Sequence, residues 1–115
     1  MIEQCNGFTC PVEATISLIG GKYKAVILWH LMNSTLRYSE LHRKMPKATD
    51  KMLAQQLREL EKDGLINRVV FPVVPPKTEY SLTEYGKTLA PILDAMCSWG
   101  ENYLSKAQNG KEGCQ

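Results

Sequence analysis

The stretch STLRYSELHRKMPKATDKMLAQQLRELEKDGLINRVVFPVVPPKTEYSL, residues 34–82, decides the fold of this chain. Its hydrophobic spacing and its prolines predict a series of consecutive elements. These are a helix over Tyr38–Met45, a break at Pro46–Ala48, a helix from Thr49 to about Gly64, and extended strands over Leu65–Pro72 and Thr78–Leu82. Helix, turn, helix and β-hairpin is the order of a winged helix-turn-helix, a mostly helical α+β fold. Such a fold would offer one helix to a DNA major groove and one hairpin to the flanking backbone.

Length and composition are those of one soluble globular domain. The chain has 115 residues, of which 43% are hydrophobic and 23% charged, and its net charge is +2. We expect a flexible arm over residues 1–9, a domain over 10–106 and a disordered tail over 107–115. The net charge is too small to indicate nucleic acid, but residues 37–51 hold five basic side chains against two acidic ones. This local excess fits a basic patch, although a solvated surface can show the same count.

The chain lacks the marks of secretion, membrane insertion or metal binding. Residues 1–10 have no basic start followed by a long apolar run, and no stretch reaches the roughly 18 apolar residues of a membrane span. We therefore expect a cytoplasmic protein with no membrane partner. The four cysteines, at positions 5, 10, 97 and 114, form no CxxC pair, so we expect neither a metal nor another cofactor.

Three further helices are predicted around the central stretch. The first begins at Cys10-Pro11 and ends at Gly20-Gly21, and Val12, Ile16 and Ile19 give it one apolar face. The second, Lys22–Met32, is apolar nearly all round, which predicts the centre of the core. The third is capped by Thr83 and runs to about Lys106, with a possible kink at Pro91.

The helix that starts at Thr49 is the expected reader of DNA. Leu53, Leu57 and Leu60 share its inward face, and a polar stripe lies opposite them. Helices in a major groove contact bases mainly through their N-terminal half, and Lys, Arg and Gln suit bases and phosphates. The expected base-contacting residues are Thr49, Lys51, Met52, Gln55 and Gln56. Arg58 on the same helix is an expected phosphate contact. Further expected DNA-binding residues are Tyr38, Ser39 and Lys47 from the preceding helix and turn.

A plainer interpretation is that this stripe is the solvated face of an amphipathic helix. Glu59 and Glu61 support that interpretation, because their charges would oppose DNA at the C-terminal half. A winged helix used only for protein interaction is a related alternative.

The hairpin has the composition of a wing. Its prolines cannot donate backbone hydrogen bonds, so they belong at a tip or an edge. Arg68 and Lys77 are placed to contact phosphates if the hairpin is a wing. The alternative is an ordinary edge hairpin with solvated charges.

The last helix carries more apolar surface than one small domain needs. A second row, at positions 93, 97, 100 and 104, runs beside its main stripe. The surplus predicts a two-fold homodimer that reads a near-palindromic operator, although one wide stripe could instead wrap on its own domain. The expected dimer contacts are Leu89, Ile92, Met96, Trp99 and Tyr103.

Short motifs are distributed over nearly the whole chain, from about Cys10 to Leu104. They are CPVE at 10–13, IGGKYK at 19–24, RYSEL at 37–41, MLAQQLRELE at 52–61, DGLI at 63–66, YSLT at 80–83 and WG at 99–100. Together these motifs resemble the HxlR-type bacterial transcriptional regulators, relatives of the MarR-like winged-helix proteins. One departure is Tyr23, where the family more often has Trp. The resemblance implies a homodimeric DNA-binding regulator joined through its terminal helices.

Cys10 is a candidate redox sensor. Some members of the family use the cysteine at the start of the first helix to sense oxidants or electrophiles, and Cys10 occupies that position. A helix N-terminus favours the thiolate, the reactive form. The alternatives are a packing cysteine or a plain N-cap. A thiol enzyme is not expected, since neither His30 nor His42 is near Cys10 in the sequence.

Overall fold

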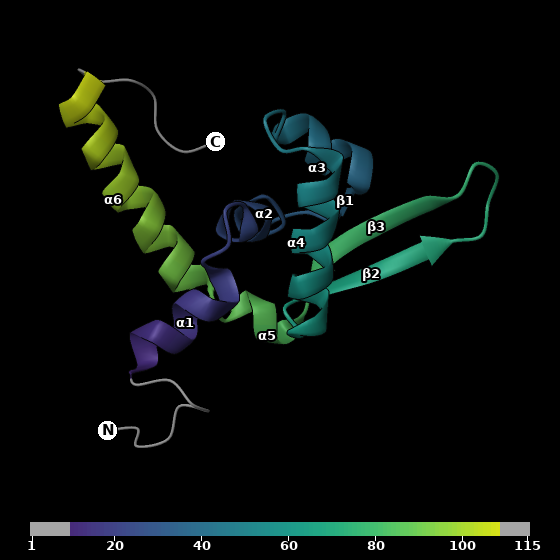
Figure 1. The fold of residues 1–115 in the computed structure, drawn as a ribbon, viewed down its shortest axis with the longest axis horizontal. Coiled ribbons are helices and arrows are strands. Elements are labelled where there is room, and N and C mark those ends of the chain that lie inside the picture. The colour runs from purple at the N-terminus through teal and green to yellow at the C-terminus, as the bar shows by residue number, and fades with distance from the viewer. Residues whose placement is uncertain (1–9, 109–115) are drawn as a thin grey trace.

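The computed structural model describes residues 10–108, and these form a winged helix-turn-helix (Figure 1). The arm predicted over 1–9 and residues 109–115 of the predicted tail lie outside the described residues. Residues 107 and 108, predicted to belong to the disordered tail, are instead helical. The predicted fold class is confirmed. In chain order the elements are α1 (Pro11–Ile19), α2 (Lys24–His30), β1 (Leu36–Arg37), α3 (Tyr38–Lys44), α4 (Asp50–Lys62), β2 (Ile66–Phe71), β3 (Lys77–Leu82), α5 (Glu84–Lys87) and α6 (Ala90–Gln108).

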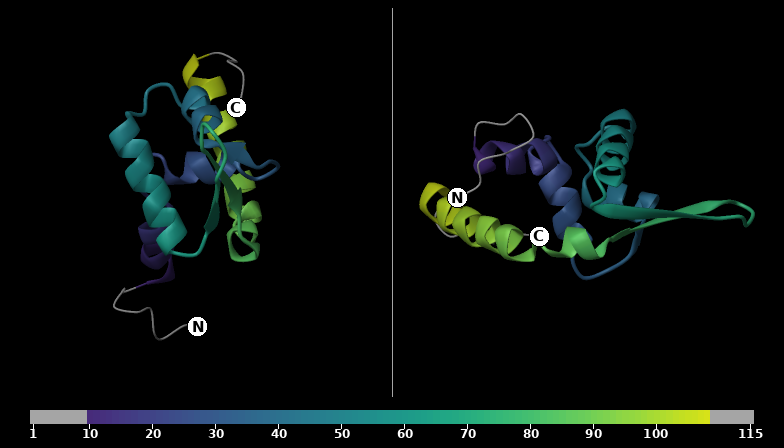
Figure 2. Two further views of the ribbon diagram at one scale, coloured as in Figure 1. Left: turned by 90° about the vertical axis from the view of Figure 1, so that its right-hand side faces the viewer. Right: turned by 90° about the horizontal axis from the view of Figure 1, so that it is seen from below.

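The sheet has three antiparallel strands in the order β1-β3-β2. β1 pairs its two residues with Tyr80 and Glu79 of β3, and β2 pairs with β3 from Ile66–Leu82 out to Phe71–Lys77. The hairpin is therefore anchored at its base and extends far beyond the helices at its tip (Figures 1 and 2). This projecting hairpin is the wing.

The core is built from the inward faces of α2, α3 and α4 and from the base of the wing. The side chains that are almost completely removed from solvent are Ile27, Leu28, Leu41, Leu53, Leu57, Leu60, Leu65 and Ile66. The central position predicted for α2 is confirmed by Ile27 and Leu28, but Val26 is exposed, so this helix is not buried all round. Burying one such side chain contributes about 1.5–3 kcal/mol, so this cluster is the main source of stability.

Both ends of α4 are set by local chemistry. Thr49 caps its start, because the Thr49 hydroxyl accepts a hydrogen bond of 3.1 Å from the Met52 amide. Gly64 ends it with φ of +79°, a backbone conformation that glycine adopts without strain. The chain then reverses directly into β2, and the Leu65 amide donates to the Leu60 carbonyl at 3.0 Å.

The predicted single helix from Thr83 to about Lys106 is wrong in one respect: it is two helices. Thr83 does cap the first, α5, since its hydroxyl accepts from the Gly86 amide at 2.9 Å. The helix then breaks at Thr88 and Leu89, and α6 begins at Ala90. Pro91 is the reason: a continuous helix would press its ring against the Lys87 carbonyl, and proline has no N–H to donate.

α6 leaves the body of the molecule as a long arm, with α1 on the same side (Figures 1 and 2). Leu93 is buried near its start, whereas most of the later residues are exposed. Within residues 10–108, no helix combines the length and the apolar character that crossing a membrane requires.

Candidate nucleic-acid interface

The turn between α3 and α4 is held by its own buried side chains. Met45 and Ala48 are buried in the core on either side of exposed Pro46 and Lys47. The Ala48 amide donates to the Met45 carbonyl at 3.0 Å, which closes the turn. The angle between the two helices is therefore fixed by packing.

A polar network on the outer side ties the start of α3 to the start of α4. The Tyr38 hydroxyl donates to Asp50 Oδ1 at 2.9 Å, and His42 Nε2 lies 3.4 Å from the same oxygen. The rings of Tyr38 and His42 stack with centroids 6.1 Å apart. Partial burial, followed by the hydrogen bond to Asp50, raises the pKa of Tyr38 to about 12. Tyr38, proposed from the sequence as a DNA contact, thus already has a partner within the protein.

The outer face of α4 carries the predicted polar stripe. Lys51, Gln55, Arg58 and Lys62 are all exposed, while Leu53, Leu57 and Leu60 are buried on the opposite face. Thr49 is exposed at the N-terminus and Met52 is half-buried. On one accessible surface α4 therefore presents Thr49 and Gln55, whose side chains can both donate and accept hydrogen bonds. The same surface carries the cations Lys51, Arg58 and Lys62.

Gln56 does not belong to this surface. Its side chain is only 7% exposed, and its Oε1 accepts a hydrogen bond of 3.1 Å from the Tyr23 amide. A Cβ added at Gly21 would lie 2.5 Å from the same oxygen, so a side chain there would displace the amide of Gln56. The expectation that Gln56 reads a base is therefore wrong, because the residue joins α4 to the turn before α2.

The charge of Glu59 repels DNA less than that of an unpaired carboxylate, because Glu59 has a cationic partner within the protein. Lys24 on α2 is buried, and its Nζ lies 2.8 Å from Glu59 Oε1. The hydrogen bond from Lys24, followed by that from Gln55, lowers the pKa of Glu59. Lys24 offsets the carboxylate charge, so the main electrostatic objection to this face of α4 is weakened.

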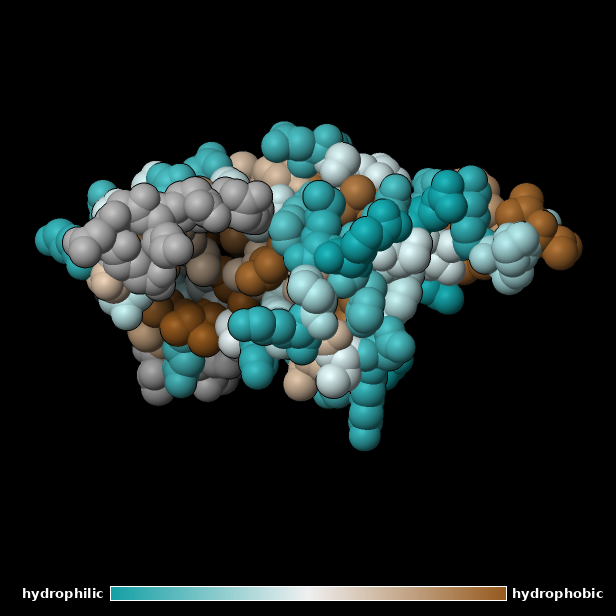
Figure 3. All heavy atoms as spheres, turned by 90° about the horizontal axis from the view of Figure 1, so that it is seen from above, coloured by the Kyte–Doolittle hydropathy of each residue, from teal (hydrophilic) through white to brown (hydrophobic). Residues whose placement is uncertain are grey.

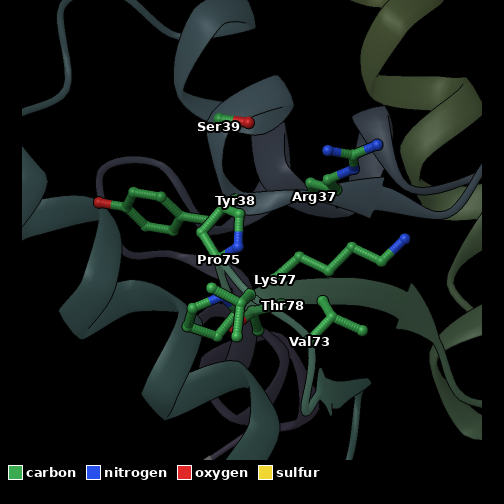
Figure 4. A pocket seen from close by; sticks show the side chains of 9 residues that line it. Arg37, Tyr38, Ser39, Val73, Pro75, Lys77 and Thr78 are labelled. Atoms are coloured by element: carbon green, nitrogen blue, oxygen red, sulfur yellow. The ribbon is translucent and has the colours of Figure 1, made fainter.

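A groove lies between the start of α3 and the tip of the wing, with a volume of about 630 Å³. Arg37 and Lys77 extend from its lining in the same direction, while Tyr38 points away from them (Figure 4). Lys77 Nζ lies 5.0 Å from the centre of the Phe71 ring, which favours its position by a cation–π contact. Ser39 also lines the groove and is exposed.

Arg68 and Lys77 do not lie together. In the hairpin register Arg68 pairs with Tyr80, while Lys77 pairs with Phe71, and these two pairs are an odd number of residues apart. Successive side chains of a strand point to opposite faces, so the two cations lie on opposite faces of the wing. Arg37, which pairs with Glu79, shares the face of Lys77. Sequence reasoning missed Arg37 because that reasoning did not include the register.

A second, apolar surface lies on α1 and α6. Figure 3 shows hydrophobic residues in a hollow on one side of the molecule. Trp99 is 70% exposed, its ring stacks on that of Tyr103 at 5.9 Å, and Val12 of α1 is 65% exposed. Leu89 is different, because it is half-buried against the domain's own core. The large apolar side chains exposed on the two helices are Val12, Ile16, Ile92, Met96, Trp99 and Tyr103.

Cys10 is exposed and free at the N-cap of α1, and its thiol makes no capping hydrogen bond. Cys97, on α6, is disulfide-bonded.

His30 is half-buried, and burial, followed by the charge of Lys44, lowers its pKa. His42 contacts Asp50 on the outer surface. Among residues 10–108, His, Cys, Asp and Glu form no group of three or more that could hold a metal ion.

The fold and the exposed polar face of α4 define a winged helix-turn-helix protein of the kind that regulates transcription. Residues 18–108 match the family model described as HxlR-like helix-turn-helix. Over 99 residues the chain is 57% identical to the uncharacterized HTH-type transcriptional regulator YtcD of Bacillus subtilis (strain 168), with 86% of this chain and 79% of YtcD covered. The chain belongs to the HxlR-like helix-turn-helix family, a family of regulators and not of enzymes.

Solved structures agree with this assignment. The crystal structure of YtcD matches with a TM-score of 0.79 at 57% identity and covers 84% of this chain and 99% of that one. The redox regulator HypR in its oxidised form matches with a TM-score of 0.78 at 50% identity and covers 81% of this chain and 96% of HypR.

The Tyr38 network predicts a pH dependence of stability. Because the pKa of Tyr38 is about 12 in the folded chain and 10.0 ordinarily, its contribution is complete below about pH 10 and is lost between about pH 10 and 12. Tyr38→Phe removes the hydrogen bond to Asp50 and should cost about 1 kcal/mol at neutral pH. Urea unfolding of both proteins across this range should show the difference between them shrinking as pH rises. A difference in the free energy of unfolding that stays constant with pH would contradict the raised pKa of Tyr38 in the folded chain.

Proposed function

We propose that this protein is a homodimeric, sequence-specific DNA-binding regulator of transcription that reads its operator with α4. The observation that carries the proposal is the exposed stripe of Lys51, Gln55 and Arg58 directly opposite the buried leucine face. The buried face leaves the helix one accessible side, and that side has the chemistry of a major-groove reader.

The proposed contacts divide into two groups. Near bases we place the N-terminal half of α4, with Thr49, Lys51, Met52 and Gln55. On the phosphates we place Arg58 of α4, Lys47 of the turn, Ser39 of α3 and Lys77 of the wing, with Arg37 beside it. Tyr38 supports this surface through Asp50, and its ring flanks the same groove. Arg68 would reach only a phosphate on the other side of the wing.

Two substitutions separate base reading from backbone binding. Gln55→Ala should flatten the preference at one base pair by about 1–3 kcal/mol and leave the other positions unchanged. Lys77→Ala should weaken all duplexes alike and reduce the dependence of log K on log salt by about one. Fluorescence anisotropy with selected and scrambled duplexes measures both effects. If wild type binds both duplexes equally at about 150 mM salt, sequence-specific binding is contradicted. If it binds neither duplex at low salt, a protein-interaction module is favoured.

The homodimer rests on the apolar surface of α1 and α6. Six large apolar side chains stay exposed there: Val12, Ile16, Ile92, Met96, Trp99 and Tyr103. Large apolar side chains exposed together on two helices of a small domain support an interface there. A second copy would meet it by two-fold symmetry and set two α4 helices on a near-palindromic operator. Leu89 packs on its own core and would contribute to the base of this interface only indirectly.

Trp99→Asp tests the dimer. A charge at the centre of the apolar surface should convert the dimer to monomer at micromolar concentration, because a buried unpaired carboxylate is costly. Analytical ultracentrifugation measures the mass. The matched control is Tyr85→Asp, since Tyr85 is also exposed but lies on α5. A dimer that survives Trp99→Asp, or a wild type that is monomeric, would contradict the interface.

Cys10 supports a second, narrower proposal, that the regulator responds to oxidants. Cys10 is exposed and free, it precedes the exposed apolar face of α1, and the matched structure of HypR is that of a redox regulator. An oxidant that takes two electrons and two thiol protons would join Cys10 to a second thiol as a disulfide. The disulfide at Cys10 would then disturb the neighbouring apolar face of α1, which belongs to the proposed dimer interface.

Diamide tests the role of Cys10. Treatment of wild type should release the operator, and dithiothreitol should restore binding, whereas Cys10→Ser should keep the operator throughout. Electrophoretic mobility shift with one labelled duplex measures the release. If both proteins release alike, or neither does, Cys10 is not the switch.

A further inference from the structure

Three side chains from two helices form a chain of contacts that ends on the proposed reading surface. Lys24 Nζ, on α2, lies 2.8 Å from Glu59 Oε1, and the other oxygen, Glu59 Oε2, accepts a hydrogen bond of 3.2 Å from Gln55 Nε2. The two carboxylate oxygens therefore hold different partners. Lys24 is buried within the body of the domain, and Gln55 is exposed on the outer face of α4.

The rigidity of this chain comes from Lys24. The side chain of Lys24 is 8% exposed, so few water molecules compete with Glu59 for its ammonium group. The side chain of Glu59 is 41% exposed. α2 and α4 are also joined next to this pair, because the Tyr23 amide donates to Gln56 at 3.1 Å. An exposed carboxylate on a helix would ordinarily sample several rotamers, and the buried cation restricts it to one.

The carboxylate in turn decides which way the amide of Gln55 faces. A carboxylate only accepts hydrogen bonds, so the NH₂ group of Gln55 must lie toward Glu59. The carbonyl oxygen, on the other branch of the planar amide, then lies away from Glu59. The second N–H of the NH₂ group remains available beside it. Gln55 is thus presented in one of its two amide orientations.

We propose that Lys24 and Glu59 are positioning residues that fix the amide of Gln55, so that the protein selects adenine, and next cytosine, over guanine and thymine at the base that Gln55 faces. The inference rests on the proposed function and adds a specificity to it. Adenine and cytosine present an amino donor in the major groove, and adenine adds the N7 acceptor for the second N–H. Guanine and thymine present acceptors where the oriented carbonyl needs a donor.

Selection from a pool of random duplexes tests the proposal, with preference at each base pair as the readout. Wild type should prefer adenine or cytosine at one position by roughly 5- to 150-fold, the range expected of one good base contact. Lys24→Met keeps the buried volume but removes the cation, so the preference at that position should collapse while the other positions keep theirs. Lys24→Arg keeps the charge and should keep the preference.

Two further variants make the result decisive. Glu59→Asp keeps the charge but withdraws the carboxylate from Gln55 by one methylene, so it should also reduce the preference, and it serves if thermal unfolding shows that Lys24→Met is not folded. Glu61→Gln is the matched control, because Glu61 is exposed on the same helix. Removing its charge should raise affinity for all duplexes alike and leave every base preference unchanged.

The outcomes separate this inference from the proposed function. A wild type without any sequence preference would overturn the proposed function itself. If wild type is selective and Gln55→Ala abolishes the preference at one position, but folded Lys24→Met and Glu59→Asp both retain it, the positioning role is wrong. A preference for guanine or thymine at the Gln55 position would overturn the amide orientation.

Discussion

Burial of the leucine face of α4 is the constraint on which the rest of this structure depends. Leu53, Leu57 and Leu60 enter the core together, and each is almost fully removed from solvent. Their burial fixes the rotation of α4 about its axis, and a helix fixed in rotation presents a fixed opposite side. The exposed stripe is therefore a consequence of core packing. The cap at Thr49 and the chain reversal at Gly64 set where this helix begins and ends.

The segment between α1 and α2 is more than a connection. Gly21 makes room for the amide of Gln56, Tyr23 donates to that amide, and the Tyr23 hydroxyl reaches the Lys47 carbonyl at 3.4 Å. Lys24 adds the ion pair with Glu59. One short segment thus contacts both the turn before α4 and α4 itself. Packed and hydrogen-bonded groups therefore connect the residues that follow α1 to α4.

Much of this architecture follows from periodicity and turn chemistry. The order of elements, the caps at Thr49 and Thr83, and the two faces of α4 could all be predicted, because each depends on residues close together in the sequence. The failures share a different origin. Gln56 is polar but buried, and its partner Tyr23 lies 33 residues away in the sequence. Lys24 and its partner Glu59 are likewise far apart, at positions 24 and 59. The separation of Arg68 from Lys77 depends on the strand register, and the break before α6 depends on how strongly Pro91 acts in its context.

The break between α5 and α6 has a consequence for the spacing of an operator. α6 has 19 residues, so it is a lever about 28 Å long at 1.5 Å per residue. In a dimer joined through α6, a turn of about 10° at Thr88 and Leu89 would move the far end by about 5 Å, more than the roughly 3.4 Å rise of one base pair. Two residues at the foot of a helix would then set the distance between half-sites.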